Sequence, residues 1–334
     1  MPEDTVPDVH REGVSAQQRE APRIGFIGTG LIGTPMVERL LECGLRVSIW
    51  NRTTDRLAPL VALGADAEAS AIDVALRADI ICLCLTNTDA VRDVVFGATG
   101  LVDVLSADSL LIDLSSIDPD ATVSMAAELV ARSGAHWLDA PVSGGLPAAR
   151  AGRLIVFAGG AVEDIARAAP VFDALAVRVT HMGGHGAGQL AKSCNQMIVA
   201  CNLMVIAEML AFGRAVGIDS ARLPDALAGG FADSLPLQIF GRRMANDVDT
   251  PRIGALATFR KDIEQVVRLG AAHHASVPMS ERAAALYRAA GAHTDVGIDA
   301  DVSRLIHMFA SGGMQSSDGA ALHQHRNAPI DSTR

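Results

Sequence analysis

Short apolar runs alternate with longer amphipathic stretches along the first half of the chain. From Arg23 onward the runs are rich in β-branched residues, and residues 79–85 form an almost continuous apolar segment. This alternation is typical of a parallel sheet with helices on its faces. It predicts strands over residues 24–28, 46–50, 79–85, 109–114, 136–140, 154–158 and 177–180. It predicts helices over residues 31–43, 71–76, 88–95, 119–132 and 162–175.

The strand pattern ends after His181, where a glycine-rich segment leads into a long apolar stretch. Residues 189–216 are expected to form one helix, roughly 40 Å long at about 1.5 Å per residue. Its apolar residues lie on most sides, so it should be buried between domains or between subunits. Further helices are predicted over residues 221–229, 237–246, 256–274, 279–290 and 300–309.

The predicted fold class is α/β. A Rossmann-type parallel sheet domain over residues 23–184 is followed by an all-helical C-terminal domain over residues 185–310, and a long helix joins them. The 334 residues suffice for two domains at about 150 residues each. The polar segments 1–22 and 311–334 are expected to be disordered tails.

Composition and charge narrow the possible functions. The formal net charge of −10 argues against a nucleic-acid partner, because such proteins usually carry a basic face. The sequence shows no signal-peptide run and no lone membrane span. Its five cysteines lack metal-ligand spacing. We therefore expect a cytoplasmic protein with reduced thiols, no bound metal and no membrane partner.

The use of basic residues is unusual. Lys192 and Lys261 are the only lysines among the 28 basic residues of the chain, and all the others are arginine. Lysine can lose its proton when it is buried or lies near another cation, whereas arginine stays charged. This bias favours a chemical role for the two lysines.

A glycine-rich turn closes the first predicted strand and opens the first predicted helix. In this context the GxGxxG pattern predicts a dinucleotide site, with the phosphates at the helix N-terminus. The glycines allow a tight turn, close approach of the pyrophosphate, and packing of helix on strand. The residues of the turn are Gly28, Thr29, Gly30, Leu31, Ile32 and Gly33.

The residues after later strands indicate which dinucleotide binds. Asn51, Arg52 and Thr53 follow the second strand, where an NAD site usually places Asp or Glu. Since arginine suits a 2′-phosphate, the pattern favours NADP, with NAD still possible. Loops at the same sheet edge should line the nicotinamide end, through Leu85, Thr86 and Ser116.

Three polar residues share one face of the long helix. Lys192, Asn195 and Gln196 are spaced i, i+3 and i+4 in an otherwise apolar segment. Burying such groups costs several kcal/mol unless they are partnered, so a site explains them best. A lysine with a lowered pKa can act as base in alcohol oxidation and as acid in carbonyl reduction. Separately, Ser143, Gly144 and Gly145 follow a strand at the same edge and could hold a carboxylate.

Together these segments resemble the β-hydroxyacid dehydrogenase family, which includes 3-hydroxyisobutyrate dehydrogenase and tartronate semialdehyde reductase. The resemblance covers about residues 23–309. Its motifs are GTGLIG at 28–33, DAPVSGG at 139–145, GAGQLAKSCNQ at 186–196 and FRKD at 259–262.

The resemblance implies reversible hydride transfer between NAD(P) and a small 3-hydroxy acid. It makes Lys192 the general acid/base, places Asn195 at the substrate and brings Lys261 to the cofactor. The substrate carboxylate is assigned to Ser143, Gly144 and Gly145, and we add Ser116 and Gln196 to the substrate site. A homodimer or homotetramer formed through the helical domain is also expected.

Several alternatives stay open. The KxxNQ form of the lysine motif leans towards 2-hydroxy-3-oxopropionate (tartronate semialdehyde) reductase rather than 3-hydroxyisobutyrate dehydrogenase. Thr86 departs from the proline that many relatives carry, which leaves the cofactor loop uncertain. The rivals are an imine reductase-like enzyme and an inactive NADP-binding module, and Lys192 counts against both.

Overall fold

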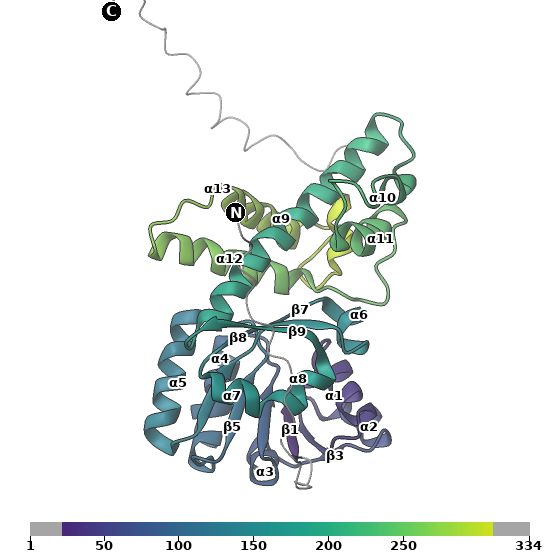
Figure 1. Cartoon of the computed structure of the whole chain (residues 1–334). Coiled ribbons are helices and arrows are strands. Elements are labelled where there is room, and N and C mark those ends of the chain that lie inside the picture. The colour runs from purple at the N-terminus through teal and green to yellow at the C-terminus, as the bar shows by residue number, and fades with distance from the viewer. Residues whose placement is uncertain (1–21, 310–334) are drawn as a thin grey trace, which may run out of the picture.

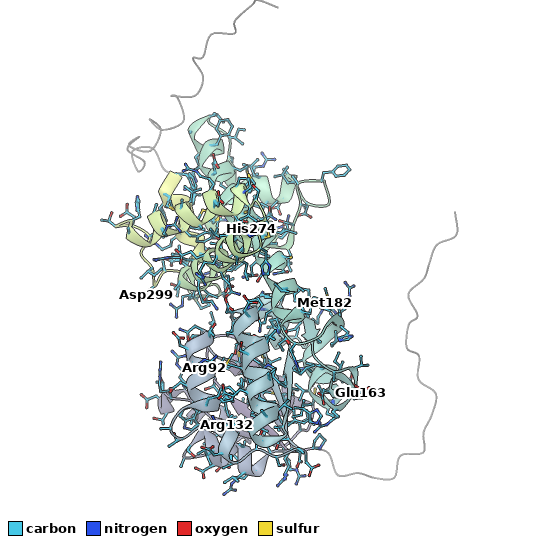
Figure 2. All side chains as sticks on the ribbon, turned by 90° about the vertical axis from the view of Figure 1, so that its left-hand side faces the viewer. Arg92, Arg132, Glu163, Met182, His274 and Asp299 are labelled. Atoms are coloured by element: carbon cyan, nitrogen blue, oxygen red, sulfur yellow. The ribbon has the colours of Figure 1, made fainter. Side chains whose placement is uncertain are left out.

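The computed structural model describes residues 22–309. The chain folds into a lobe built on a β-sheet and a lobe built from helices, with one long helix running from the first into the second (Figure 1). The view turned by 90° shows the same two lobes, with Arg92 and Arg132 on the sheet lobe and His274 on the helical lobe (Figure 2). The expected two-part α/β architecture is confirmed.

The sheet has nine strands in the order β3-β2-β1-β4-β5-β6-β8-β7, with β9 paired to β8. The strands are β1 Ile24–Ile27, β2 Val47–Trp50, β3 Asp66–Ala67, β4 Ile80–Leu83, β5 Leu110–Asp113, β6 His136–Asp139, β7 Val142–Ser143, β8 Leu154–Gly159 and β9 Ala176–Gly183. All neighbouring pairs are parallel except β6–β8 and β7–β8. The expected parallel arrangement holds for β1 to β6, whereas β8 and β9 run in the opposite direction, because the chain reverses through the segment between β7 and β8.

Eight helices accompany the sheet: α1 Gly33–Glu42, α2 Ala58–Ala62, α3 Ala71–Arg77, α4 Thr88–Phe96, α5 Pro119–Ser133, α6 Gly145–Arg150, α7 Val162–Arg167 and α8 Ala169–Leu175. One predicted helix, over residues 162–175, is broken at Ala168. Pro170 has no N–H to continue the hydrogen bonds of α7. It is tolerated in the first turn of a helix, and α8 therefore begins at Ala169. Apolar clusters cover both faces of the sheet, and the central strands β1, β4 and β5 are fully buried.

The second lobe contains α9 Ala187–Ala215, α10 Leu223–Ala226, α11 Arg242–Ala245, α12 Leu256–Ala272 and α13 Pro278–Ala292. Shorter turns of 3₁₀ or π type replace parts of the predicted helices: Ser220–Arg222, Leu237–Gly241 and Val302–Phe309. Its core is a single apolar cluster around α9, α12 and α13. In it the Tyr287 hydroxyl donates to the Ala200 carbonyl of α9 (3.2 Å).

Helix α9 connects the two lobes. Its 29 residues correspond to about 43 Å at about 1.5 Å per residue. Within the described residues it is the one helix long and apolar enough to cross a membrane by length and composition, and half of that apolar window is buried inside the protein. Its buried side packs in the core of the second lobe, and its first turns lie against the sheet.

Candidate active site

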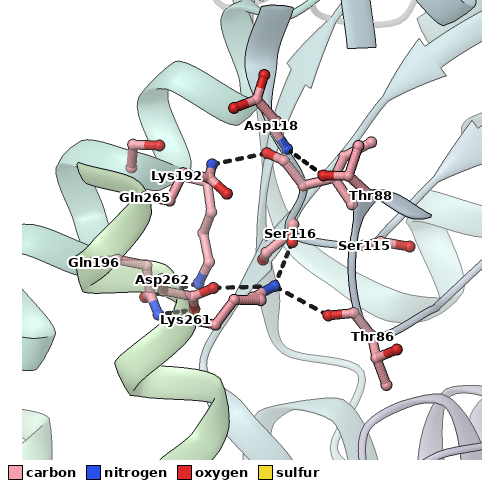
Figure 3. A network of polar contacts seen from close by, with 12 residues as sticks. Thr86, Thr88, Ser115, Ser116, Asp118, Lys192, Gln196, Lys261, Asp262 and Gln265 are labelled. Atoms are coloured by element: carbon pink, nitrogen blue, oxygen red, sulfur yellow. Dashed lines mark hydrogen bonds and ion pairs between the residues drawn. The ribbon is translucent and has the colours of Figure 1, made fainter. Parts of the chain in front are cut away.

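The candidate site lies where several parallel strands end. Strands β1, β4, β5 and β6 run in the same direction, so the loops that follow them meet at one edge of the sheet. The first turns of α9 and the side chains of α12 reach the same edge (Figures 1 and 3). Residues from four separate sequence motifs therefore come together here.

The glycine-rich turn after β1 has the geometry expected for a dinucleotide. Gly28 has φ +106°, and a Cβ there would lie 2.3 Å from the Cys84 carbonyl oxygen. A Cβ on Gly33 would lie 2.0 Å from the Gly28 carbonyl oxygen, so α1 can pack closely on β1 only with glycine at this position. The helix itself begins at Gly33, two residues later than predicted. Leu31 is exposed and Ile32 is half-buried in the turn before it.

Two polar features of this turn point towards a ligand. The Thr29 hydroxyl is buried and has no hydrogen-bond partner. The space above Gly30 is open, and its nearest neighbour is the guanidinium of Arg56, 4.0 Å from an added Cβ. Arg56 lies four residues after Arg52 in an exposed turn, and no sequence motif pointed to it.

The segment after β2 forms that exposed turn. The Asn51 side-chain amide donates to the Thr53 carbonyl (2.8 Å), which holds the turn together. Arg52 and Thr53 are exposed at the end of β2. Because β2 lies next to β1, Arg52 and Arg56 are on the same side of the site as the glycine turn.

Lys192 is buried and hydrogen-bonded. Its side chain is in the first turns of α9, and the residue is 9% exposed. Its ammonium donates to Gln196 Oε1 (2.9 Å), and the Asn195 amide donates to the same oxygen (2.8 Å). The Gln196 amide in turn donates to the Asp262 carboxylate (2.6 Å) on α12. The shared helix face predicted from the spacing is thus joined to a second helix.

Burial changes the protonation chemistry of Lys192. Desolvation lowers the pKa of its ammonium from 10.5 to about 8, with Lys261 adding to the fall and Asp262 opposing it. An amine with this pKa exchanges its proton near neutral pH, which an ordinary lysine does not. A small cavity of about 10 Å³ adjoins it, lined by Ser116, Gln189, Lys192, Ser193, Gln196, Asp262 and Gln265.

The proposed carboxylate loop touches the lysine cluster through Asn195. The Ser143 hydroxyl donates to Asn195 Oδ1 (3.2 Å), which connects β7 with α9. Gly144 and Gly145 follow with positive φ values, +123° and +66°, and lead into the unpredicted helix α6. A Cβ on Gly144 would lie 2.5 Å from the Ala148 side chain, so this tight turn needs glycine.

Lys261 ties α12 to the cofactor loops (Figure 3). Its ammonium donates to the backbone carbonyls of Thr86 (3.1 Å) and Ser116 (2.5 Å), and it pairs with Asp262 (3.2 Å). Leu85 is held beside them, because its N–H donates to the Ser115 hydroxyl (2.9 Å). The Gln265 amide also reaches this loop, donating to the Ile117 carbonyl (2.9 Å). Both lysines of the chain therefore lie at one edge of the sheet.

Sequence reasoning missed the residues that hold this cluster in place. Asp262 was noted only as part of the FRKD segment, yet it orients Gln196 and pairs with Lys261. Gln189 and Asp139 likewise lay in the motifs but received no role. The rings of His181 and His185 hydrogen-bond backbone carbonyls. Between residues 22 and 309, no three His, Cys, Asp or Glu side chains gather in a way that could hold a metal ion.

Two known families match successive parts of the chain. Residues 23–184 match the NAD binding domain of 6-phosphogluconate dehydrogenase. Residues 186–309 match the family described as NAD-binding of NADP-dependent 3-hydroxyisobutyrate dehydrogenase.

Individual relatives agree with this assignment. The chain is 34% identical to 2-hydroxy-3-oxopropionate reductase of Escherichia coli over 279 residues, which is 83% of this chain and 94% of that protein. It is 36% identical to 3-hydroxyisobutyrate dehydrogenase of Pseudomonas aeruginosa over 65% of this chain and 72% of the relative. The solved Mycobacterium tuberculosis 3-hydroxyisobutyrate dehydrogenase with L-serine superposes with a TM-score of 0.74 at 29% identity, covering 86% and 99% of the two chains.

The charges around Lys192 make a prediction about its titration. Removing the negative charge in Asp262→Asn should lower the pKa of Lys192 further, because Asp262 is the charge that raises it. At neutral pH the neutral fraction of Lys192 should then grow severalfold. Amine-directed labelling across a pH series, read by peptide mass spectrometry, measures this directly.

Lys261 is the only other lysine of the chain, but it pairs with Asp262, so the labelling of Lys192 is compared between protein variants and not against Lys261. Glu264→Gln is the matched control, because Glu264 lies on the same helix but pairs with Arg260 and Arg288. An unchanged or raised pKa of Lys192 in Asp262→Asn would contradict the described arrangement.

Proposed function

Since the chain belongs to the β-hydroxyacid dehydrogenase family within the 6-phosphogluconate dehydrogenase superfamily, we propose that it reversibly reduces a small 3-oxo acid or semialdehyde with NADPH. The observation that carries this proposal is a buried lysine, with a pKa of about 8, at the carboxyl edge of a dinucleotide-binding sheet. An amine there can give a proton to a carbonyl oxygen at physiological pH and take it back in oxidation.

The residues present fit a nicotinamide dinucleotide. The tight turn at Gly28, the open backbone at Gly30 and the unpartnered Thr29 hydroxyl form a cradle at the N-terminus of α1. Arg52 would hold a 2′-phosphate, and the position of Arg56 makes it a second candidate. Leu85, Thr86, Ser116 and Lys261 would border the nicotinamide end. When bound, the nicotinamide supplies or accepts the hydride.

The protein groups have separate tasks in the proposed reaction. Ser143 and the N–H groups of Gly144 and Gly145 hold the substrate carboxylate. Asn195 orients the reacting oxygen, and Lys192 donates the proton to that oxygen as it gains negative charge. Gln196, fixed by Asp262, keeps the Lys192 ammonium in place.

Relatives define the candidate substrates. The Escherichia coli relative is named for 2-hydroxy-3-oxopropionate, and the KxxNQ motif favours the same branch. The Pseudomonas relative is named for 3-hydroxyisobutyrate, and the mycobacterial structure contains L-serine. All three compounds are small acids that carry an oxygen on the carbon β or α to a carboxylate, which suits one carboxylate clamp and one proton-transfer group.

The test is oxidation of NADPH, and separately of NADH, with tartronate, methylmalonate and succinate semialdehydes, and reduction of NADP⁺ with L-serine. Turnover in reduction should fall as the pH rises through about 8, because only protonated Lys192 donates. In oxidation it should rise over the same range. Lys192→Ala should lower kcat about 10²-fold or more, abolish this pH dependence and leave cofactor affinity nearly intact.

If Lys192→Ala were as active as the unchanged protein, Lys192 would not be the proton-transfer group. Tight NADPH binding with no turnover of any of these substrates would favour the imine reductase-like alternative. Absence of both binding and turnover would remove the enzyme proposal altogether.

Cofactor choice gives an independent prediction. Arg52→Ala should weaken NADPH binding about 10-fold or more while changing NADH binding little, since only NADPH carries the 2′-phosphate. Arg56→Ala should act in the same direction, and Arg46→Ala, at the opposite end of β2, is a matched control. Cofactor fluorescence titration measures the dissociation constants of NADPH and NADH for each variant and for the unchanged protein. Equal loss for both cofactors would show that neither arginine reads the phosphate.

We also propose that two copies of the chain pair along α9. Ile198, Val205 and Phe212 repeat every seven residues on its outer side and are 69%, 53% and 65% exposed. A repeat of seven keeps residues on one face over several turns. Burying such an apolar row against a second copy removes it from water, which favours association.

The double variant Ile198→Glu, Phe212→Glu should halve the mass of the assembly in size-exclusion chromatography with light scattering. Leu76→Glu is the control, because Leu76 is similarly exposed (62%) but lies on the sheet lobe. A monomeric unchanged protein, or an assembly that survives the double change, would refute pairing along α9.

A further inference from the structure

We propose that Asp139 is the positioning residue that sets where Lys192 stands relative to the sheet. This inference rests on the proposed function and adds a residue to it. Asp139 ends β6, is fully buried, and lies 53 positions before Lys192 in the sequence. Its carboxylate makes no hydrogen bond with Lys192 or with the residues assigned to the substrate.

The Asp139 carboxylate receives the free N–H groups at the start of α9. Its Oδ1 accepts from Gly186 N (2.8 Å) and its Oδ2 accepts from Gln189 N (3.1 Å). The first N–H groups of a helix have no acceptor within the helix. The acceptor is usually a side chain that directly precedes the helix in the sequence. Here the acceptor comes from the sheet, so capping the helix also fixes it to β6.

Two glycines let the helix and a neighbouring strand approach the carboxylate. A Cβ on Gly159 of β8 would lie 2.7 Å from both Asp139 oxygens. A Cβ on Gly188 of α9 would lie 2.8 Å from Oδ2 and 2.4 Å from the Phe157 carbonyl oxygen. The backbones of α9 and β8 therefore pack directly around Asp139, and this contact leaves the helix little room to slide.

Gln189 adds a second attachment on the same turn. Its side-chain amide donates to the Ser115 carbonyl (2.8 Å) and its Oε1 accepts from Ile117 N (3.1 Å). Together with the two bonds to Asp139, these fix the helix along its axis and in rotation. Lys192 follows Gln189 by three residues, about one turn, so its position on the helix face is set by these bonds.

A role in positioning differs from a role in stability alone. Asp164 is a buried carboxylate of the same lobe (2% exposed) that binds His136 (2.9 Å) and Arg167 (3.2 Å) and makes no hydrogen bond or ion pair with α9. Asp139→Asn and Asp164→Asn should both lower the melting temperature. Only Asp139→Asn should displace Lys192, because an amide offers a donor where the carboxylate accepted an N–H.

The experiment combines three measurements on Asp139→Asn, with Asp164→Asn as control. We expect kcat to fall about 30- to 100-fold, as a displacement of about 1 Å can cause, with NADPH affinity changed less than about 3-fold. Labelling of Lys192 should shift to higher pH, because a displaced lysine is less desolvated. The charges that bear on the pKa of Lys192 are those of Asp262 and Lys261, so the shift would report movement and not the lost charge of Asp139.

The proposal is overturned if Asp139→Asn loses no more activity than Asp164→Asn, or if Lys192 labels as in the unchanged protein. Should Asp139→Asn fail to fold, Gln189→Met removes the other attachment and is expected to give the same three changes; unchanged labelling and turnover there would overturn the proposal equally. If the unchanged protein turns over none of the substrates, the proposed function fails, yet the labelling shift still tests positioning.

Discussion

The burial of one ammonium group governs the arrangement of the site. Taking a charged amine out of water is costly unless acceptors and a counter-charge compensate for the lost hydration. The Lys192 ammonium donates to the Gln196 side chain, and that side chain in turn donates to the Asp262 carboxylate, which supplies the counter-charge. Lys261 pairs with the same carboxylate. With both lysines protonated, the three charged groups sum to +1 in a protein of net charge −10. A monoanionic carboxylate brings that local sum to zero, which is consistent with an acid as the proposed substrate.

The direction of each hydrogen bond follows from Asp262. An ionised carboxylate can only accept, so the Gln196 amide must turn its nitrogen towards it and its oxygen towards Lys192 and Asn195. Asn195 then presents its own oxygen to the Ser143 hydroxyl. One residue of α12 thereby orients side chains on α9 and β7, and a continuous series of hydrogen bonds connects the two lobes. This explains why the site needs both lobes, although each has its own apolar core.

The parts of this molecule that the sequence predicted are those with a local signature. The glycine turn lies between a strand and a helix, and the Lys192 face is a spacing within one helix, so both could be read from a few neighbouring residues. Most strands and the long helix were also predicted, with ends displaced by a few residues.

The pairing of β7 with β8 was missed, because a two-residue strand has no periodicity. The links of Asp139 to Gln189 and of Gln196 to Asp262 span 50 and 66 residues, and only the packing of the two lobes brings them together. Arg56 was missed for a different reason, because its approach to Gly30 depends on how the turn after β2 folds.

The near-absence of lysine has a consequence for how the protein behaves in alkaline solution. Arginine keeps its proton at any pH a protein survives, so the surface cations carry constant charge where a lysine-rich surface would begin to neutralise. The single tyrosine adds nothing in that range, because burial raises the pKa of the Tyr287 hydroxyl well above 10. With the thiols of the protein blocked, electrophoretic mobility and colloidal stability should therefore drift little between about pH 8 and 10. An alkaline titration of this protein thus separates the behaviour of one interior amine from the background of its surface.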